Sequence, residues 1–418
     1  DILFILTAVI NAMILLPFIF LFSPSSFIND KFAKIKVIRI CAIFGVIISV
    51  AVLFSYLAGA FGVAFALTLI LAAQSAIYSP AKYGIIKALV GPERLGTANG
   101  IIQALTIVAI LFSSFLFSFI FENLYIQGGN SEEILKSVYP IGIFLVVFSA
   151  LEAYFAYKLP YISEINEDNE KFELKRYISL SYLRENLKEV RSDKNIWLSI
   201  AGLSIFWGIS QIIIAAFPAH YKAVFNDDSS LAVQAILAAS AIGIAFGSYV
   251  AGSMSKLHIE LGIVPMGAIG IFFSLLFFAF GSSIGVVSLS SFAFGFFGGI
   301  FIVPLNAMIQ YFAPQKTTGK IMAANNCLQN VSMLLFLAIG IGLVYFEIST
   351  TGLFVFTALV CLIGSFYAIL QLPHLFTRLL LLPFLKTKYR FFVEGLQNLP
   401  QSGGALLLGN HISWIDWL

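Results

Sequence analysis

His411 and Asp416, near the end of the sequence, are of types that can together move a proton. An imidazole, whose unperturbed pKa is about 6.5, can take the proton of a hydroxyl group at neutral pH. A carboxylate beside it can fix the imidazole tautomer and stabilise the imidazolium that forms. A histidine and an aspartate at this spacing are common by chance, so the surrounding residues decide how much weight the pair has.

A second set of polar residues lies inside long apolar stretches, where an amide or carboxyl group is costly unless it faces a cavity or a partner. Such residues are candidates for a substrate path, although each amide could instead form a hydrogen bond between two helices. Glu152 is the only acid deep in such a stretch, which argues against a proton relay of several carboxylates. The candidates are Asn11, Gln74, Asn99, Gln103, Glu152, Gln211, Gln234, Asn306, Asn325 and Gln329.

The composition is that of an all-α integral membrane protein. Hydrophobic residues make up 60% and charged residues 11% of the 418 residues, whereas soluble domains carry about 25% charge. The apolar blocks are long enough to cross a membrane as helices and lack the alternation of a β-barrel strand. The net charge of +3 is spread over many connections and indicates no nucleic-acid partner. The three cysteines have no metal-ligand spacing, so we expect no metal site and no bound cofactor.

Eleven apolar runs predict the membrane spans. They cover residues 2–22, 38–58, 60–79, 99–121, 138–158, 196–217, 231–254, 261–281, 284–306, 323–346 and 351–372. If the first run ends inside the cell, 22 of the 24 Lys and Arg residues lie in inside connections, and only Lys136 and Lys222 lie outside. The positive-inside rule therefore predicts the orientation together with the number of spans.

Residues 78–103 and 303–329 repeat one plan, in which a proline at the foot of an apolar run is followed by a basic turn. In both stretches Ala-Asn then opens the next run, so that Asn99 corresponds to Asn325. Such a repeat is typical of transporters built from two related halves. Because the second half has six runs and the first has five, we expect a further span before Asp1.

The repeat divides the chain into a first half, residues 1–158, a charged linker, residues 159–195, and a second half, residues 196–372. Part of the linker can form a helix with four apolar residues close to one face. Two interpretations remain open, an amphipathic helix on the membrane surface and a solvated linker helix. The four residues are Ile178, Leu183, Leu187 and Val190.

Glycines and prolines inside the runs predict local packing and bends. Gly243 and Gly247 are four residues apart, and Gly295 is followed by Gly298 and Gly299, arrangements that let two helices approach closely. Proline inside a span can kink it and free backbone carbonyls. The prolines so placed are Pro17, Pro218 and Pro304.

Two six-helix halves joined by a charged linker resemble the major facilitator superfamily, whose members carry a Gly-x-x-x-Asp-(Arg/Lys) motif after their second span. Here Asp30, Lys31 and Lys34 match the charged positions, and Ser26 stands where the family usually has glycine. The resemblance implies that these three charged residues gate transport by latching the two halves on the cytoplasmic side. The alternative is that Asp30 caps a helix or neutralises a basic connection.

Residues 373–418 are predicted to begin a soluble α/β domain, with short strands at 390–394 and 405–408. The stretch Val-Glu-Gly-x4-Pro-x2-Gly-Gly at 393–404, followed by Asn410 and the His411-x4-Asp416 pair, resembles the glycerophospholipid acyltransferases. The resemblance implies that His411 and Asp416 are catalytic, activating a glycerol hydroxyl for attack on an acyl thioester. Acyl-carrier protein or acyl-CoA would be the acyl donor.

The two resemblances together match the bacterial lysophospholipid transporters fused to a 2-acylglycerophosphoethanolamine acyltransferase, and residues 79–84, Ser-Pro-Ala-Lys-Tyr-Gly, resemble these transporters as well. This implies a multi-pass protein of the bacterial inner membrane with its linker and C-terminal domain in the cytoplasm. It would flip lysophospholipids, chiefly lysophosphatidylethanolamine, from the outer to the inner leaflet for reacylation. Its partners would be lysophospholipid, membrane lipids and acyl-carrier protein. An exporter of drugs or small metabolites and a membrane-anchored acyltransferase remain alternatives.

Overall fold

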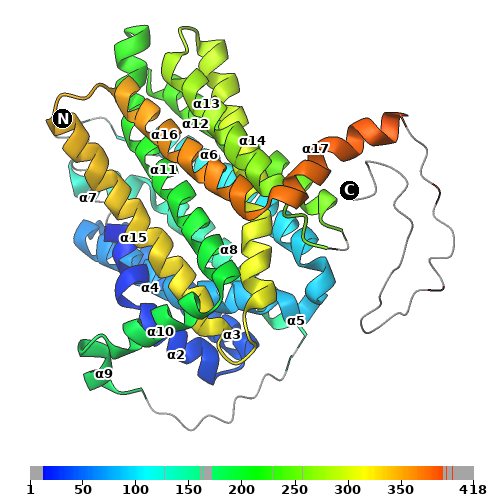
Figure 1. Ribbon diagram of the computed structural model, residues 1–418. Coiled ribbons are helices and arrows are strands. Elements are labelled where there is room, and N and C mark those ends of the chain that lie inside the picture. Colours follow the sequence, from blue (N-terminus) through cyan, green and yellow to red (C-terminus); the bar gives the residue numbers. More distant parts are fainter. Residues whose placement is uncertain are drawn as a thin grey trace.

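The computed structural model is a bundle of long helices (Figure 1), and it describes residues 13–126, 128–160, 162, 172–227, 229–256, 258–388, 392 and 398. Within these residues, ten helices are long and apolar enough to cross a membrane. A helical pair bent by 51°, Met13–Phe20 and Phe22–Lys31, makes an eleventh span if it is counted as one. The count agrees with the eleven predicted runs.

The helices of the first half are α2 Phe22–Lys31, α3 Lys34–Ala58, α4 Phe61–Gly84, α5 Ile86–Val90, the 3-10 helix Pro92–Arg94, α6 Leu95–Leu124, α7 Ser131–Ser137 and α8 Tyr139–Lys158. Within this half α3 packs against both α4 and α8. Arg39, near the start of α3, donates to the carbonyl oxygens of Ala156 at 3.3 Å and Leu159 at 2.9 Å. The guanidinium thereby satisfies carbonyls at the end of α8 that have no helical partner.

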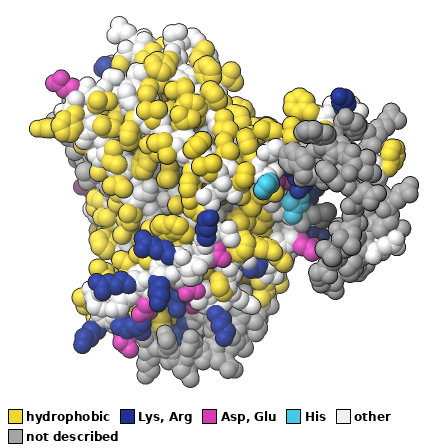
Figure 2. All heavy atoms as spheres, viewed as in Figure 1, with side chains coloured by type: hydrophobic (Ala, Val, Ile, Leu, Met, Phe, Trp, Pro, Cys, Tyr) yellow, Lys and Arg dark blue, Asp and Glu magenta, His cyan; other side chains and the backbone are white. Residues whose placement is uncertain are grey.

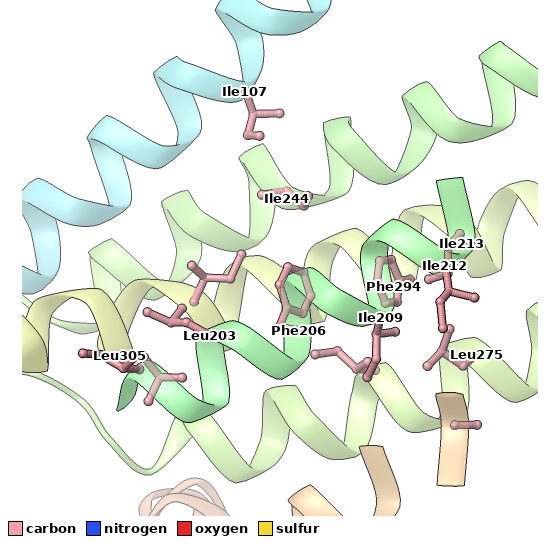
Figure 3. Close-up of a cluster of buried hydrophobic side chains, with 14 of the residues drawn as sticks. Ile107, Leu203, Phe206, Ile209, Ile212, Ile213, Ile244, Leu275, Phe294 and Leu305 are labelled. Carbon is pink, nitrogen blue, oxygen red and sulfur yellow. The ribbon is translucent and has the colours of Figure 1, made fainter. Parts of the chain in front are cut away.

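The helices of the second half are α11 Lys194–Phe225, α12 Ser230–Met254, α13 Ile263–Phe280, α14 Ile284–Phe312, α15 Thr318–Tyr345, α16 Thr350–Gln371 and α17 Pro373–Lys388. Side-chain oxygens of Asp193, Ser229, Ser283 and Ser349 cap the starts of α11, α12, α14 and α16. The core of this half forms around α11, whose Phe206 and Ile209 lie beside Phe294 and Leu275 (Figure 3). In Figure 1, α17 projects away from the bundle.

Glycines bring α12 and α14 into backbone contact. A Cβ atom added to Gly247 would lie 1.9 Å from the carbonyl oxygen of Phe296. One added to Gly295 would lie 1.8 Å from the carbonyl oxygen of Ser240. Neither position has room for any side chain, so the close packing predicted from the spacing of these glycines is confirmed.

The helix pairs along which the two halves meet include α6 with α12, α6 with α14, α2 with α15 and α4 with α15. Figure 3 shows Ile107 of α6 facing Ile244 of α12, and both side chains are buried in the same apolar cluster. Nearer the end of α12, a Cβ atom on Gly100 would lie 2.7 Å from the Cα atom of Gly252 and 2.6 Å from the carbonyl oxygen of Ser248. The halves are therefore in close contact at this end.

This end of the molecule carries the ends of α2, α4 and α12, the starts of α3, α6 and α15, and the linker. We call it the basic end, because Lys and Arg side chains gather there (Figure 2). Figure 2 shows Lys and Arg side chains gathered where the linker helices lie, while apolar side chains cover most of the remaining visible body. The positive-inside rule predicts that the basic end faces the cytoplasm.

The linker forms α9 Leu174–Ile178 and α10 Ser181–Ser192, and α10 contacts α2, α11 and α15. Its buried residues are Tyr182, Asn186 and Val190, spaced four apart on one helical face. Ile178 is 71% exposed. The buried face of α10 therefore shares Val190 with the predicted face but uses Tyr182 and Asn186 in place of Leu183 and Leu187. Neither interpretation of the linker included the packing of this face against helices of both halves.

The first predicted run, 2–22, was too short at its inside end. The chain remains helical to Lys31 after a bend at Leu21. Ser23, Ser25, Ser26 and Asn29 are buried in this helix, and their polar side chains ended the predicted apolar run too early. Asp30 therefore lies at the end of a helix and not in a connection.

Candidate functional site

Asp30, at the end of α2 in the first half, binds the start of α15 in the second half. Its Oδ1 atom accepts a hydrogen bond from the backbone amide of Gly319 at 2.7 Å, and its Oδ2 atom accepts one from the amide of Lys320 at 3.1 Å. The first amides of a helix have no partner within it and carry partial positive charge. Asp30 therefore caps a helix, which was the alternative to its role as a latch between the halves. Because the capped helix belongs to the other half, Asp30 also joins the two halves.

The close approach of Asp30 requires a glycine on α15. A Cβ atom on Gly319 would lie 2.5 Å from Oδ1 of Asp30 and 2.8 Å from the Cβ atom of Asn29. Any larger residue at position 319 would push the end of α2 away. The contact thus depends on a glycine in one half and a carboxylate in the other.

Asn29 and Ser25 hold the end of α2 against α4. The Asn29 side chain donates to the carbonyl oxygen of Ile77 at 3.0 Å, and the Ser25 hydroxyl donates to that of Ala76 at 2.8 Å. Asn29 and Ser25 are each only 1% exposed. Buried hydrogen bonds of this kind fix the position of α2, and with it the direction of the Asp30 carboxylate.

The three residues matched to the family motif lie close together but have different surroundings. Lys34 is 5% exposed, and its side chain passes beside Gly84, where an added Cβ atom would lie 3.0 Å from Cε of Lys34. The positive charges of Lys320 and Lys34 act favourably on the Asp30 carboxylate. The Lys31 ammonium lies 5.2 Å from the ring centre of Phe27 on its own helix.

A second link between the halves is a pair of amide side chains, Asn99 on α6 and Gln310 on α14. Each amide nitrogen donates to the amide oxygen of the other residue, and both distances are 2.9 Å. Asn99 is 3% and Gln310 2% exposed. These two hydrogen bonds between one pair of buried side chains hold α6 and α14 in a defined register.

Further hydrogen bonds also cross between the halves. Thr97 at the start of α6 donates to the carbonyl oxygen of Gly252, at 3.0 Å, near the end of α12. Asn326 of α15 donates to the hydroxyl of Ser79 on α4 at 2.9 Å. Sequence reasoning missed Gln310, Thr97, Ser79 and Asn326 as site residues, although all four lie within the two repeated stretches, which were the available signal.

Several of the remaining path candidates in the described part of the chain form hydrogen bonds within a helix or between two helices. Gln74 donates to the backbone oxygen of Cys41 at 2.8 Å, which is the helix-to-helix hydrogen bond of the alternative interpretation. Asn306 donates to Ile302 of its own helix at 3.2 Å, and Gln329 donates to Asn325 one turn away at 2.7 Å. Gln103 and Gln211 are buried, and Gln234 is exposed.

Glu152 on α8 is the carboxylate that the sequence places deepest in a run. It lies within electrostatic reach of Tyr78 on α4 and of Lys82, one turn further along α4. Three other predicted site residues, Asn11, His411 and Asp416, lie outside the described residues.

The contacts also bear on the register of the repeat. Gly96 and Gly319 are each the second residue of their helix, α6 and α15, and each approaches a helix end of the other half. Aligning the halves at these glycines places Asn99 opposite Met322. The predicted partner Asn325 lies three residues further on, slightly less than one turn of about 3.6 residues.

The Asn99–Gln310 pair can be tested by its effect on stability. We expect Asn99→Leu to lower the free energy of unfolding by about 1–3 kcal/mol, because it leaves the buried Gln310 amide without a partner. The double variant Asn99→Leu/Gln310→Leu should lose less than the sum of the two single variants. Unfolding of the purified protein measures this, with exposed Asn123→Leu as a control expected within about 0.5 kcal/mol of the parent. Additive losses would show that the two amides are not coupled.

Comparison with known proteins gives the family. Residues 4–337 match the Major Facilitator Superfamily. The chain belongs to this superfamily. The lysophospholipid transporter LplT of Photorhabdus laumondii is 30% identical over 273 residues, 63% of each chain, and that of Yersinia enterocolitica is 28% identical over 268 residues, 63% of this chain and 62% of the relative. The chain thus spans a little under two thirds of these curated relatives.

Solved structures of the same superfamily support the fold. The transporter FucP, in the outward conformation, superposes with a TM-score of 0.69 over 86% of this chain and 89% of its own, at 13% identity. The human organic anion transporter MFSD10 gives a TM-score of 0.66 over 87% and 83% of the two chains, at 14% identity. The predicted all-helical facilitator fold is therefore confirmed.

Proposed function

We propose that this major facilitator protein moves lysophospholipids across the bacterial inner membrane. The observation that carries the proposal is the similarity to curated lysophospholipid transporters, 30% identity over 273 residues in the first of them. The direction is from the outer to the inner leaflet, with lysophosphatidylethanolamine as the main substrate, as the sequence resemblance implies.

The contacts at the basic end support a mechanism in which the two halves separate and rejoin. Asp30 with Gly319, and Asn99 with Gln310, close the basic end of the bundle. A substrate leaving on the cytoplasmic side has to break these contacts, and they must re-form before the next cycle. These hydrogen bonds form only when the basic end is closed, so each can bias the equilibrium between the closed and the open state.

The proposal is tested by lysolipid flipping in proteoliposomes. Lysophosphatidylethanolamine with a fluorescent head group is placed in the outer leaflet, and its protection from an external quencher is followed over time. We expect protection with the purified protein and none with empty liposomes, and we expect it to persist after truncation behind Lys388. Protein that exports dyes but leaves lysolipid unprotected would favour the alternative of a drug exporter. Acyl transfer without protection would favour a membrane-anchored acyltransferase.

Asp30→Asn is expected to slow flipping about tenfold without unfolding the protein. The asparagine side chain has one acceptor oxygen in place of two, and it has no charge to interact with the helix dipole, an interaction worth up to about 2 kcal/mol when partly buried. Flipping rate and melting temperature are measured on the same preparation. Asp193→Asn is the matched control, because Asp193 also caps a helix through two amides, those of Asn195 and Ile196, but joins no two halves. Equal flipping rates in the two variants would remove Asp30 from the gate.

We also propose that an acyltransferase follows the transporter. Support comes from the sequence alone, from His411 and Asp416 with the lead-in at 393–404. The enzyme would reacylate lysophosphatidylethanolamine, with acyl-carrier protein or acyl-CoA as donor. The last span, α16, ends on the side of the basic end, which puts the following residues on the side predicted to be cytoplasmic.

A further inference from the structure

A cavity of about 370 Å³ that opens to the surface lies within the second half, lined by α11, α13, α14 and α16. It is separate from the contacts between the halves. Its wall on α11 runs from Lys194 to Ile209, a rise of roughly 22 Å at about 1.5 Å per residue. One leaflet of a bilayer has a hydrocarbon thickness of roughly 15 Å. The cavity therefore extends over the depth of a leaflet, starting from the basic end.

The chemistry of the wall changes from one end of the cavity to the other. The deep end is formed by apolar side chains, among them Phe206, Ile209 and Ile271. The end at the surface has Lys194, Asn195 and Gln371. Apolar walls over most of the length with a cation at the mouth match an amphiphile whose charged group stays at the surface.

Asp193, the acid next to Lys194 in the sequence, is occupied at the helix start. Oδ1 of Asp193 accepts hydrogen bonds from the amides of Asn195 at 2.7 Å and Ile196 at 3.2 Å, and so it is directed at the helix start. Lys194 is exposed and can turn toward a ligand. An ammonium group at this position suits a phosphate, which it can bind by a charge-assisted hydrogen bond.

The size of the cavity limits the apolar part of the ligand. A volume of about 370 Å³ is near the lower end of the range for small-molecule sites, roughly 300–1,000 Å³. This suits one acyl chain better than two. We propose that the cavity binds a lysophospholipid, with its single acyl chain between α11 and α16 and its phosphate at Lys194. The inference concerns binding within one half and does not depend on transport.

Gly364 on α16 offers a way to fill the cavity without disturbing the fold. It lines the cavity, and a Cβ atom added to it would meet no other atom within 4 Å. Gly342 on α15 is equally unobstructed but does not line the cavity, which makes Gly342→Phe a matched control for Gly364→Phe. Each buried methylene of an acyl chain contributes roughly a factor of four to affinity. Filling the space of a few methylenes with Phe should therefore weaken binding more than about tenfold.

The test is photolabelling of the purified protein by lysophosphatidylethanolamine with a diazirine in its acyl chain, followed by peptide mapping. We expect saturable labelling of α11 and α16 peptides, lost in Gly364→Phe and kept in Gly342→Phe. Lys194→Gln should weaken labelling severalfold, whereas Lys175→Gln on α9 should not. A monoacylglycerol probe, which lacks phosphate, should be insensitive to Lys194→Gln.

Three results would overturn the inference: undiminished labelling in Gly364→Phe, equal loss in both glycine variants, or no difference between the two lysine variants. Flipping measured on the same variants separates this inference from the transport proposal. Labelling without flipping would support the binding site and contradict the transport proposal. Flipping without labelling would support the transport proposal and contradict the binding site.

Discussion

Replacing Gly295 by valine is expected to leave no folded protein. A Cβ atom at this position would lie 1.8 Å from the carbonyl oxygen of Ser240 and 2.9 Å from the amide nitrogen of Ile244. These are backbone atoms, so no rotation of a side chain relieves the overlap, and α12 and α14 must move apart. Because the two helices meet through glycines on both sides, we expect a loss above about 4 kcal/mol, which is exceptional for one substitution.

Size-exclusion chromatography and thermal unfolding of the detergent-solubilised protein measure this effect. Gly342→Val is the control, since a Cβ atom added at that position meets nothing within 4 Å. We expect the control to elute and melt like the parent protein. A well-folded Gly295→Val variant with an unchanged melting temperature would show that α12 and α14 are not in backbone contact.

His411→Ala in the full-length protein is expected to lower acyl transfer by about 10² to 10⁴, the usual contribution of general acid–base assistance. Flipping should continue at the parent rate. The reason is the order of the chain, because His411 follows the last spanning helix α16, which ends at Gln371. Asp416→Asn should show the same separation more mildly, since the proposed role of Asp416 is to orient the imidazole and stabilise its charged form.

Two assays decide this prediction: acyl transfer to lysophosphatidylethanolamine in detergent, and flipping in liposomes. His374→Ala is a suitable control, because His374 is an exposed histidine of α17. Acyl transfer at the parent rate in His411→Ala would refute the proposed enzyme. Loss of both activities in a folded variant would mean that transport and acyl transfer depend on one another.

The sequence predicted most of the fold, because a membrane span is determined by a local property, the length of an apolar run. Because the prediction relied on apolar run length, it also placed the inside end of the first span too early. Ser25 and Asn29 are polar, but the Ser25 hydroxyl and the Asn29 amide nitrogen donate hydrogen bonds to the carbonyl oxygens of Ala76 and Ile77 of α4. Only the folded arrangement shows that such residues belong to the interior of a helix.

Prediction of the site went less far. Asp30 was selected by its motif, and charge patterns suggested an acid with basic neighbours, yet its two partners are backbone amides, which no sequence pattern displays. Asn99 was selected as a polar residue in a span, but its partner Gln310 comes from the other half. The buried face of α10 was misplaced for a related reason, because it includes the polar Asn186, whose side chain donates a hydrogen bond to the hydroxyl of Ser26 of α2 at 3.2 Å.

The contact of Asp30 with main-chain amides also has a consequence for genetics. Every residue except proline carries a backbone amide, so Lys320 can change to nearly any residue while its hydrogen bond to Asp30 remains. In a selection for second-site revertants of an Asp30 variant, compensation by a new side chain at position 319 is excluded sterically. Revertants should instead map to helices whose packing changes the equilibrium between the closed and the open basic end. Among homologous sequences we therefore expect an invariant acid at position 30 and an invariant glycine at position 319, with no residue that covaries with either.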